Sequence, residues 1–196
     1  MIVHCATTNP GKLREFNQIA AHYAAGRLQV LPVPGLKDIP PPEETGATFS
    51  ANAILKAEYY SAFIDGPVFA DDSGLVVDAL NGAPGIYSAR FAGPGADDAA
   101  NNARLLEALS GCANRTARFV SAIAVAAQGH SLETFEDSVE GVILTEARGP
   151  NGFGYDPLFY HPPFGCTFGE ASPEQKLLVS HRGKAMSRMI TWILSR

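Results

Sequence analysis

The stretch F-A-D-D-S-G-L-V-V-D-A-L-N-G-A-P-G-I-Y-S-A-R, residues 69–90, decides how this chain folds. The apolar residues 67–70 predict a buried strand, and two adjacent carboxylates, Asp71 and Asp72, follow it. Residues 73–74, Ser-Gly, predict a turn after the carboxylates. Because side chains alternate along a strand, Asp71 and Asp72 are expected to point to opposite faces, so that one can face a cleft while the other braces the turn. Adjacent aspartates also occur in ordinary surface turns, and their role therefore depends on the other segments.

The composition is that of an ordinary globular protein. The chain has 196 residues, of which 46% are hydrophobic and 18% charged, and this length suits one domain or one core with two lobes. The net charge of −5 argues against a general nucleic-acid binder, which would carry a basic stripe. A nucleotide substrate held by a few local cations is compatible with that charge.

The cysteines and the apolar segments indicate in which cellular compartment the protein is expected. Cys5, Cys112 and Cys166 are widely spaced and odd in number, so they predict neither a disulfide framework nor a paired metal-ligand motif. The N-terminal residues lack the basic region and long apolar core of a secretory signal. No apolar run approaches the roughly 18 residues that suggest a membrane span. We therefore expect a cytoplasmic protein with no membrane partner.

The N-terminal segment predicts a place for phosphate. Residues 2–6 are apolar and predict a strand, after which apolar side chains recur at helical spacing over residues 13–23. Asn9 is a good N-cap, and Pro10 suits the first helical position. A strand, a small-residue turn, a helix N-terminus and Lys12 together suit a phosphate group. The same pattern also describes a capped surface helix, and it is not a Walker A loop because the required glycine-lysine spacing is absent.

The following segments alternate between strands and helices. Residues 28–33 predict a second strand, and the proline-rich residues 32–42 predict an irregular segment on the surface. Thr48 can cap a helix that runs to about residue 63. The apolar side chains expected on its inner side are Phe49, Ala53, Tyr60 and Phe63. Residues 97–109 predict a third helix, with Leu105, Leu106 and Leu109 inward, and residues 119–127 and 131–144 predict a long hairpin.

The last part of the chain contains an irregular loop and a final helix. The loop is A-R-G-P-N-G-F-G-Y-D-P-L-F, residues 147–159, and its aromatic side chains either anchor it to the core or offer a flat ligand a surface for stacking. Ser180 is the predicted N-cap of the final helix, which places His181 and Arg182 in its first turn. Cations are disfavoured there by the helix dipole, and such local conflicts more often mark a function than a requirement of the fold.

Taken together, these segments resemble the inosine triphosphate pyrophosphatase family, which acts on non-standard purine nucleoside triphosphates. The matching motifs are A-T-T-N-P-G-K at 6–12, E-E-T-G-A-T-F-S-A-N-A-I-L-K-A at 43–57, A-D-D-S-G-L at 70–75, G-A-P-G-I-Y-S-A-R at 82–90, G-F-G-Y-D-P-L-F at 152–159 and S-H-R-G-K-A at 180–185. Each motif is weak alone, but the combination is specific and follows the family's order along nearly the whole chain. Ala171 and Gln175 depart from the pattern, which usually has Leu and Glu there, and neither departure affects a catalytic position.

The resemblance implies a fold and an activity. The fold is an elongated, two-lobed α/β molecule with a long mixed β-sheet flanked by helices and a central substrate cleft, formed by residues 1–196 as a single domain and usually assembled as a homodimer. The activity is Mg²⁺-dependent hydrolysis of ITP, dITP and XTP to the monophosphate and pyrophosphate, which cleanses the nucleotide pool.

The resemblance also assigns residues to roles. Glu44 and Asp72 are the metal carboxylates, and Asp72 is in addition the general base. The residues expected to contact the substrate are Thr7, Thr8, Asn9, Pro10, Gly11 and Lys12 at the phosphates, Lys56 and Ser73 nearby, and Phe153, Gly154, Tyr155, Asp156, Lys176, His181 and Arg182 at the base.

These residue types suit the chemistry. Water must attack the α-phosphorus while pyrophosphate leaves, which requires charge neutralisation, a positioned water and a proton acceptor. Mg²⁺ prefers one or two carboxylates together with phosphates and waters, as Glu44 and Asp72 would allow. Lys176 and Arg182 offer only hydrogen-bond donors, so they favour a base with oxygen at its six position.

Three alternatives predict different properties. A phosphatase of the haloacid dehalogenase type needs two aspartates separated by one residue, whereas Asp71 and Asp72 are adjacent. A nucleotide sensor without catalysis would keep the phosphate loop and the aromatic loop but tolerate loss of Asp72. A purely structural protein would have no need of donors and carboxylates in the family's order.

Overall fold

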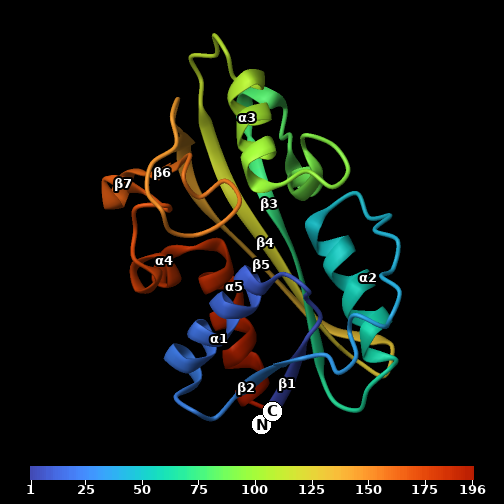
Figure 1. The fold of residues 1–196 in the computed structure, drawn as a ribbon. Coiled ribbons are helices and arrows are strands. Elements are labelled where there is room, and N and C mark those ends of the chain that lie inside the picture. The colour runs from blue at the N-terminus through green and yellow to red at the C-terminus, as the bar shows by residue number, and fades with distance from the viewer. The chain divides into compact units, whose positions relative to one another are not determined.

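The computed structural model describes residues 1–196 and contains one mixed sheet of seven strands in the order β2-β1-β3-β4-β5-β6-β7 (Figure 1). The strands are β1 Ile2–Cys5, β2 Gln29–Pro32, β3 Val68–Val77, β4 Thr116–Ala127, β5 His130–Ile143, β6 Phe159–His161 and β7 Cys166–Thr167. Strand β1 pairs in parallel with both β2 and β3, whereas β6 pairs antiparallel with β5 and β7. The expected long mixed sheet of an α/β fold is therefore confirmed.

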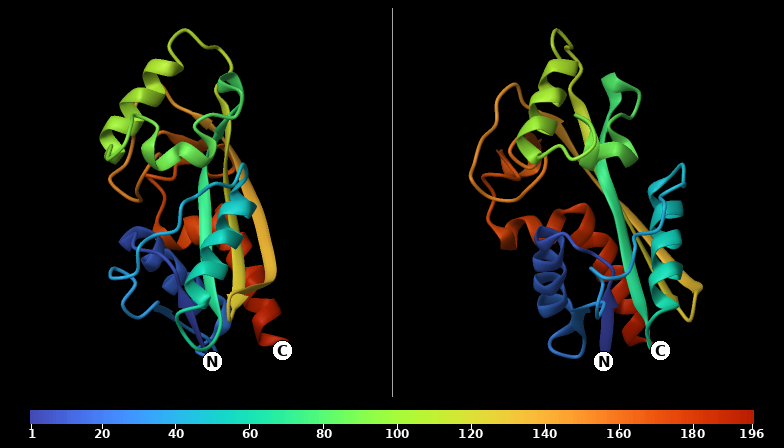
Figure 2. Two further views of the ribbon diagram at one scale, coloured as in Figure 1. Left: turned by 90° about the vertical axis from the view of Figure 1, so that its right-hand side faces the viewer. Right: turned by 45° about the vertical axis from the view of Figure 1, so that its right-hand side comes forward.

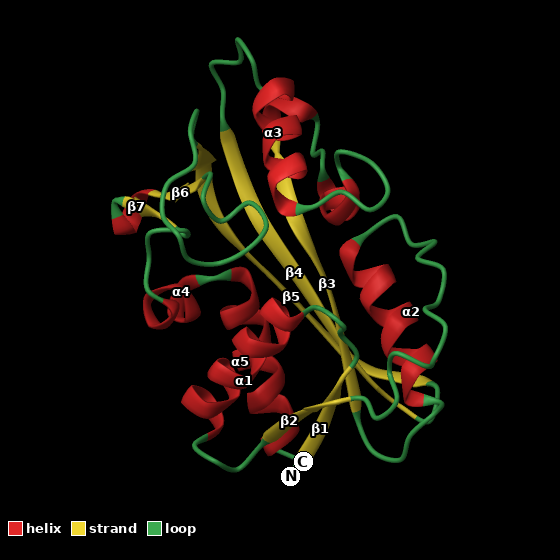
Figure 3. Cartoon of the chain, in the orientation of Figure 1, coloured by secondary structure: helices red, strands yellow, loops and turns green.

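Five α-helices accompany the sheet (Figure 3). They are α1 Pro10–Ala24, α2 Phe49–Ser61, α3 Asp98–Ala108, α4 Pro173–Val179 and α5 His181–Leu194, and 3-10 helices cover Asp78–Leu80, Gly85–Arg90 and Pro162–Phe164. The N-caps predicted for the first two helices are present, because Asn9 accepts hydrogen bonds from the backbone of α1 and Thr48 accepts one from α2. None of the helices is both long enough and apolar enough to span a membrane.

The chain divides into two compact units, and strands β3, β4 and β5 contribute residues to both. Unit 1 comprises residues 1–72, 121–137 and 181–196, and unit 2 comprises residues 73–120 and 138–180.

Unit 1 has helices on both faces of its strands. Helices α1 and α5 cover one face and α2 covers the other (Figure 2). Small side chains allow α2 to approach closely, since Ala53 and Ala57 pack with Ala122, Ala124 and Ala126 of β4, and all five are fully buried. On the final helix the expected apolar stripe is confirmed, with Met186, Met189, Ile190 and Ile193 buried.

Unit 2 is held by an aromatic core. Phe159 and Phe168 are fully buried with their ring centroids 5.0 Å apart, and the ring of Phe119 lies 4.5 Å from that of Phe159. Leu105 and Leu109 of the predicted third helix are fully buried against this cluster, as expected, while Leu106 is partly buried.

Two expectations were wrong. No turn follows the carboxylates: β3 continues without interruption from Val68 to Val77, so residues 71–74 lie in the middle of a strand. Pairing within the sheet outweighs the turn preference of Ser73 and Gly74. Phe63 is 53% exposed because α2 ends at Ser61, and helical spacing therefore does not apply to it.

Some elements were not anticipated. The sequence predicted no strand or helix between the irregular loop and the final helix, where the structure has the short strands β6 and β7 and the helix α4. A sequence signal for α4 exists: the side chain of Ser172 accepts a hydrogen bond from the backbone of Gln175, whose own side chain returns to the backbone of Ser172. Gln175 thus completes this capping box in place of the family's usual Glu.

Candidate functional site

The two carboxylates of strand β3 have different partners, as the alternation of a strand requires. The Asp71 side chain is 1% exposed, and its Oδ2 lies 2.7 Å from Nζ of Lys12 on helix α1. The hydroxyl of Ser121 donates to Asp71 Oδ1 at 2.6 Å. Asp72 instead lies 2.7 Å from Nζ of Lys56 on helix α2. The two carboxylates therefore point to opposite faces, as expected, and Asp71 is buried beside Lys12 of the phosphate loop, residues 7–12, although there is no turn for it to brace.

The buried Asp71 carboxylate also faces the first turn of helix α5. Its Oδ2 lies 3.8 Å from Nε of Arg182, and Nη1 of Arg182 donates to Glu15 at 2.9 Å. Burial would raise the pKa of Asp71, but the charges of Lys12 and Arg182 outweigh burial and hold that pKa well below its ordinary value. The carboxylates of Asp71 and Glu15 compensate the unfavourable position of the Arg182 cation at a helix N-terminus.

Lys56 joins the two residues expected to bind metal. Its Nζ lies 2.9 Å from Glu44 Oε1 and 2.7 Å from Asp72 Oδ1, so both carboxylates converge on one ammonium group. Burial raises the pKa of Asp72 above its ordinary value, although Lys56 opposes that rise. Burial acts to lower the pKa of Lys56, but Asp72 and Glu44 outweigh it and raise that pKa. Lys56 is therefore a firmly held cation.

Helix α2 fixes the loop that carries Glu44. Asn52 on this helix accepts a hydrogen bond at 2.8 Å from the backbone N–H of Gly46 and lies 3.5 Å from Asp72 through its Nδ2. A Cβ atom at Gly46 would approach the Asn52 side chain to 2.5 Å, so this contact requires glycine. Asn52 was not among the residues expected at the site, and only its contacts identify it.

The donor set is chemically suited to Mg²⁺. Glu44 and Asp72 supply hard carboxylate oxygens that converge within one ion-pair network. No group of three or more His, Cys, Asp or Glu side chains that could hold a metal ion occurs in the structure, so the protein offers two carboxylates here and no larger cluster. Two carboxylates match the way in which Mg²⁺ is usually held, with phosphates and waters completing its coordination.

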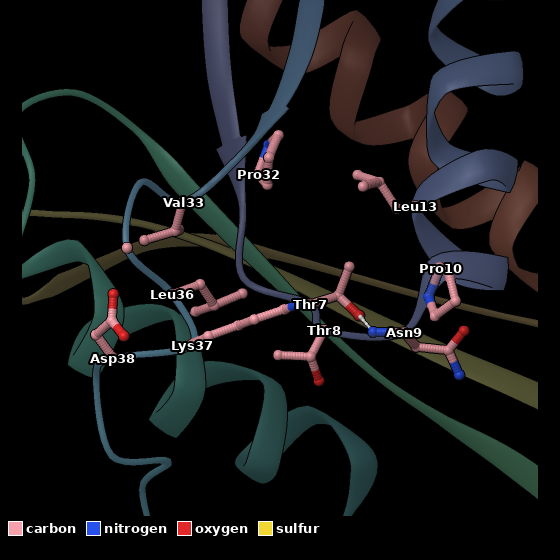
Figure 4. Close-up of a pocket in the computed structure, with 11 residues that line it drawn as sticks. Thr7, Thr8, Asn9, Pro10, Leu13, Pro32, Val33, Leu36, Lys37 and Asp38 are labelled. Atoms are coloured by element: carbon pink, nitrogen blue, oxygen red, sulfur yellow. Dashed lines mark hydrogen bonds between the residues drawn. The ribbon is translucent and has the colours of Figure 1, made fainter.

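The phosphate loop already uses several of its donors internally. Asn9 Oδ1 accepts hydrogen bonds from the backbone of Gly11 at 2.8 Å and of Lys12 at 3.1 Å, and Thr7 Oγ1 accepts one from Asn9 at 3.2 Å. The helix N–H groups that we expected to face phosphate are thus capped. Thr7, Thr8, Asn9 and Pro10 border a pocket of about 390 Å³ (Figure 4).

In unit 2, a buried ion pair organises the aromatic loop. Lys176 Nζ lies 2.6 Å from Asp156 Oδ2, with side chains 7% and 3% exposed. The same carboxylate oxygen accepts the backbone N–H of Phe153 at 2.8 Å, and the Lys176 ammonium lies 5.2 Å from the centre of the Phe153 ring. A Cβ atom at Gly152, whose φ is +77°, would collide with Asp156, so the loop requires glycine at that position.

Helix α3 holds the same loop from the other side. Asp98 accepts a hydrogen bond from the backbone of Gly154 at 2.7 Å, and Asn102 donates to the Gly154 carbonyl at 2.9 Å. The Tyr155 hydroxyl donates to the carbonyl of Ser88 at 2.7 Å in the buried interior. Tyr155 is therefore an anchor of the loop, while Phe153 is half-buried. Sequence patterns gave no signal for Asp98 or Asn102.

The expected site residues are divided between the two units. Unit 1 contains Thr7, Thr8, Asn9, Pro10, Gly11, Lys12, Glu44, Lys56, Asp72, His181 and Arg182. Unit 2 contains Ser73, Phe153, Gly154, Tyr155, Asp156 and Lys176.

Comparison with known proteins covers the whole chain. The sequence profile of the Ham1 family matches residues 3–192. The chain is 47% identical over 186 residues to a dITP/XTP pyrophosphatase of Listeria innocua serovar 6a, covering 94% of this chain and 90% of that protein. It is 46% identical over 202 residues to a dITP/XTP pyrophosphatase of Syntrophobacter fumaroxidans, covering 100% of this chain and 86% of the other.

The fold is similar to that of solved structures as well. The Staphylococcus aureus Ham1 protein superposes with a TM-score of 0.86 at 39% sequence identity, covering 100% of this chain and 99% of that one.

Proposed function

This chain belongs to the Ham1 family, and we propose that it is a pyrophosphatase that hydrolyses dITP, ITP and XTP to the corresponding monophosphate and pyrophosphate. The observation that carries the proposal is the network in which Lys56 joins Glu44 and Asp72, within a chain that is similar over its full length to dITP/XTP pyrophosphatases. Such a network provides two oxygen ligands, one base and one fixed cation, which are the parts that phosphoryl transfer needs.

Glu44 and Asp72 are the residues that would hold Mg²⁺. When bound, the ion would neutralise charge on the phosphates and on the leaving pyrophosphate. Lys56 adds a positive charge that is already held beside both carboxylates. Because Asn52 holds the Glu44 loop through Gly46, these groups require little rearrangement before substrate binds.

Asp72 serves as the general base. It accepts a proton from water as the water oxygen forms its bond to the α-phosphorus, and the bond from that phosphorus to the bridging oxygen breaks to release pyrophosphate. The raised pKa of Asp72, which burial causes, makes its carboxylate a stronger acceptor than an exposed aspartate. Lys12 and Lys56 attract the phosphates, each oriented by a carboxylate from the same strand.

The base of the nucleotide is read by the aromatic loop and by the first turn of helix α5. Phe153 offers a ring face to the purine, and Lys176, which Asp156 holds, offers a donor to an oxygen at the six position. His181 and Arg182 contribute to the same recognition. The two-lobed form with a central substrate cleft, which the resemblance implies, belongs to this proposal. A homodimer in the cytoplasm belongs to the same proposal.

Product analysis tests this function directly. The purified chain is supplied with ITP, dITP, XTP or ATP and Mg²⁺, and the released pyrophosphate, orthophosphate and monophosphate are measured separately. We expect one pyrophosphate and one monophosphate per substrate, with ATP the poorest of the four. Release of orthophosphate alone would identify a phosphatase, and binding of ITP without any release would identify a nucleotide sensor.

A further inference from the structure

The pocket beside the phosphate loop contains a cation to which no role has been given. Residues 7–10 and Leu13 form one wall, and the end of strand β2 with the loop after it, residues 32–38, forms the other. Lys37 and Asp38 are the only charged residues that line the pocket. Figure 4 shows the Lys37 side chain extended in the direction of Thr7 and Thr8, whereas the Asp38 carboxylate is turned away from them.

The backbone around Lys37 is fixed on both sides. Leu36 donates its N–H to the carbonyl of Val33 at 3.2 Å, and Asp38 donates to the carbonyl of Gly35 at 2.8 Å. Val33 and Leu36 are 2% and 8% exposed, so they anchor this loop in the core of unit 1. Lys37 itself is exposed and makes neither a hydrogen bond nor an ion pair through its side chain. The backbone position of Lys37 is therefore fixed, and no carboxylate of the protein pairs with its ammonium group.

The phosphate loop contributes no charged side chain to this pocket. Its own lysine, Lys12, is paired with the buried Asp71, and the first helix N–H groups are capped by Asn9. What the loop presents to the pocket is the uncharged polar groups of Thr7, Thr8 and Asn9. Uncharged donors alone leave most of the charge of a polyphosphate unneutralised.

We propose that Lys37 binds the terminal phosphates of the substrate, the part that leaves as pyrophosphate. This inference rests on the proposed function and adds a residue to it. Glu44 and Asp72 are not among the residues that line the pocket, so the reacting α-phosphorus lies elsewhere and the pocket receives the phosphates beyond it. None of the residues assigned to the base lines the pocket, so we assign the pocket to phosphates.

The test compares the affinity for two products. Lys37→Gln and Lys37→Arg are prepared together with Arg104→Gln, which removes an exposed positive charge from helix α3 and controls for net charge. Inhibition constants for pyrophosphate and for IMP are measured with Mg²⁺ present. We expect Lys37→Gln to weaken pyrophosphate inhibition about 2–5-fold, the upper part of the range for an accessible ion pair, while IMP changes less than about 1.5-fold. Lys37→Arg keeps the charge and should restore most of the loss, and Arg104→Gln should change neither constant.

Calorimetric binding of pyrophosphate gives a second measurement that needs no turnover. The difference between wild type and Lys37→Gln should shrink as ionic strength rises, because salt screens an accessible charge. An unchanged pyrophosphate affinity in Lys37→Gln overturns the inference, even if ITP hydrolysis is intact. Equal losses for pyrophosphate and IMP also overturn it, because the residue would then act on the α-phosphate or on the loop. A wild type that binds pyrophosphate but does not hydrolyse ITP would reject the proposed function alone.

Discussion

Asp71 and Asp72 are neighbours on strand β3, yet their carboxylates hold lysines from two different helices. Asp71 lies 2.7 Å from Lys12 of α1, and Asp72 lies 2.7 Å from Lys56 of α2. Because successive side chains leave a strand on opposite faces, one dipeptide orients two cations from two directions. The Asp71 side chain is 1% exposed and that of Asp72 is 11% exposed, so only Asp72 has the solvent access that the metal ligand and base of the proposed function need.

Replacing Asp72 with Asn should leave a folded protein that turns over poorly. The change keeps the size of the side chain but removes the base, and general-base help contributes on the order of 10²–10⁴ in rate. Steady-state kcat with ITP is the measurement, with circular dichroism as the check on folding. Asp78→Asn is a matched control, since Asp78 lies just beyond the same strand and pairs with Arg118. A folded Asp72→Asn protein with near wild-type kcat would remove Asp72 from catalysis.

Activity should depend on Mg²⁺ and on Glu44. EDTA should abolish hydrolysis and added Mg²⁺ restore it, while Ca²⁺, with its longer and looser coordination, should support it badly. Glu44→Gln should raise the Mg²⁺ concentration needed for half-maximal rate, whereas the exposed Glu43→Gln should shift it less than about twofold, because only Glu44 joins the Lys56 network. Equal shifts for both variants would contradict this distinction.

Asp71→Asn should destabilise the fold in a pH-dependent way. Removing the carboxylate leaves Lys12 and Arg182 without their shared partner, and breaking a buried pair costs about 3–5 kcal/mol, with the lower end expected because Lys12 is 18% exposed. The folded pKa of Asp71 is lowered, so its contribution is fully present above its unfolded pKa of about 3.9 and is lost as pH falls toward the folded value. Urea unfolding should therefore show the largest gap between wild type and variant at pH 7, shrinking below about pH 4. A gap that grows on acidification would contradict the assignment.

Lys176 and Asp156 should be strongly coupled. Each single change, Lys176→Met or Asp156→Asn, leaves one buried group without its partner, whereas the double variant leaves neither charge. We expect the sum of the losses in unfolding free energy of the two single variants to exceed the loss of the double variant by about 1–3 kcal/mol. Urea unfolding of the four proteins measures this difference. Simple additivity would show that the pair does not hold the aromatic loop.

Base choice should depend on Arg182. Hypoxanthine has an oxygen at the six position that accepts a hydrogen bond, whereas adenine has an amino group there. We expect this difference to favour ITP over ATP in kcat/KM by about 10²-fold. Arg182→Ala should lower kcat/KM for ITP much more than for ATP. Arg188→Ala, on the exposed side of the same helix, is the control. Equal losses for both substrates would mean that Arg182, through Glu15 and Asp71, supports the structure and does not read the base.

The sequence alone determined most of the elements, because caps and periodicity act over a few residues. Asn9 and Thr48 marked where helices begin, and the alternation of strand side chains placed Asp71 and Asp72 on opposite faces. At Ser73 and Gly74 the local preference for a turn disagreed with pairing in the sheet. Pairing prevailed, and these two residues lie within strand β3.

Only the tertiary structure decided which charges meet. Nothing in the local pattern pairs Asp71 with Lys12, Asp72 with Lys56 or Asp156 with Lys176, because these partners come from separate elements that packing brings together. The sequence marked Lys12 as a phosphate ligand, but it could not show that a buried carboxylate already holds it, nor that Lys37 faces the adjoining pocket. Composition and periodicity report whether a side chain is buried, whereas the partner of a charge depends on distances between remote segments, which the packed fold alone sets.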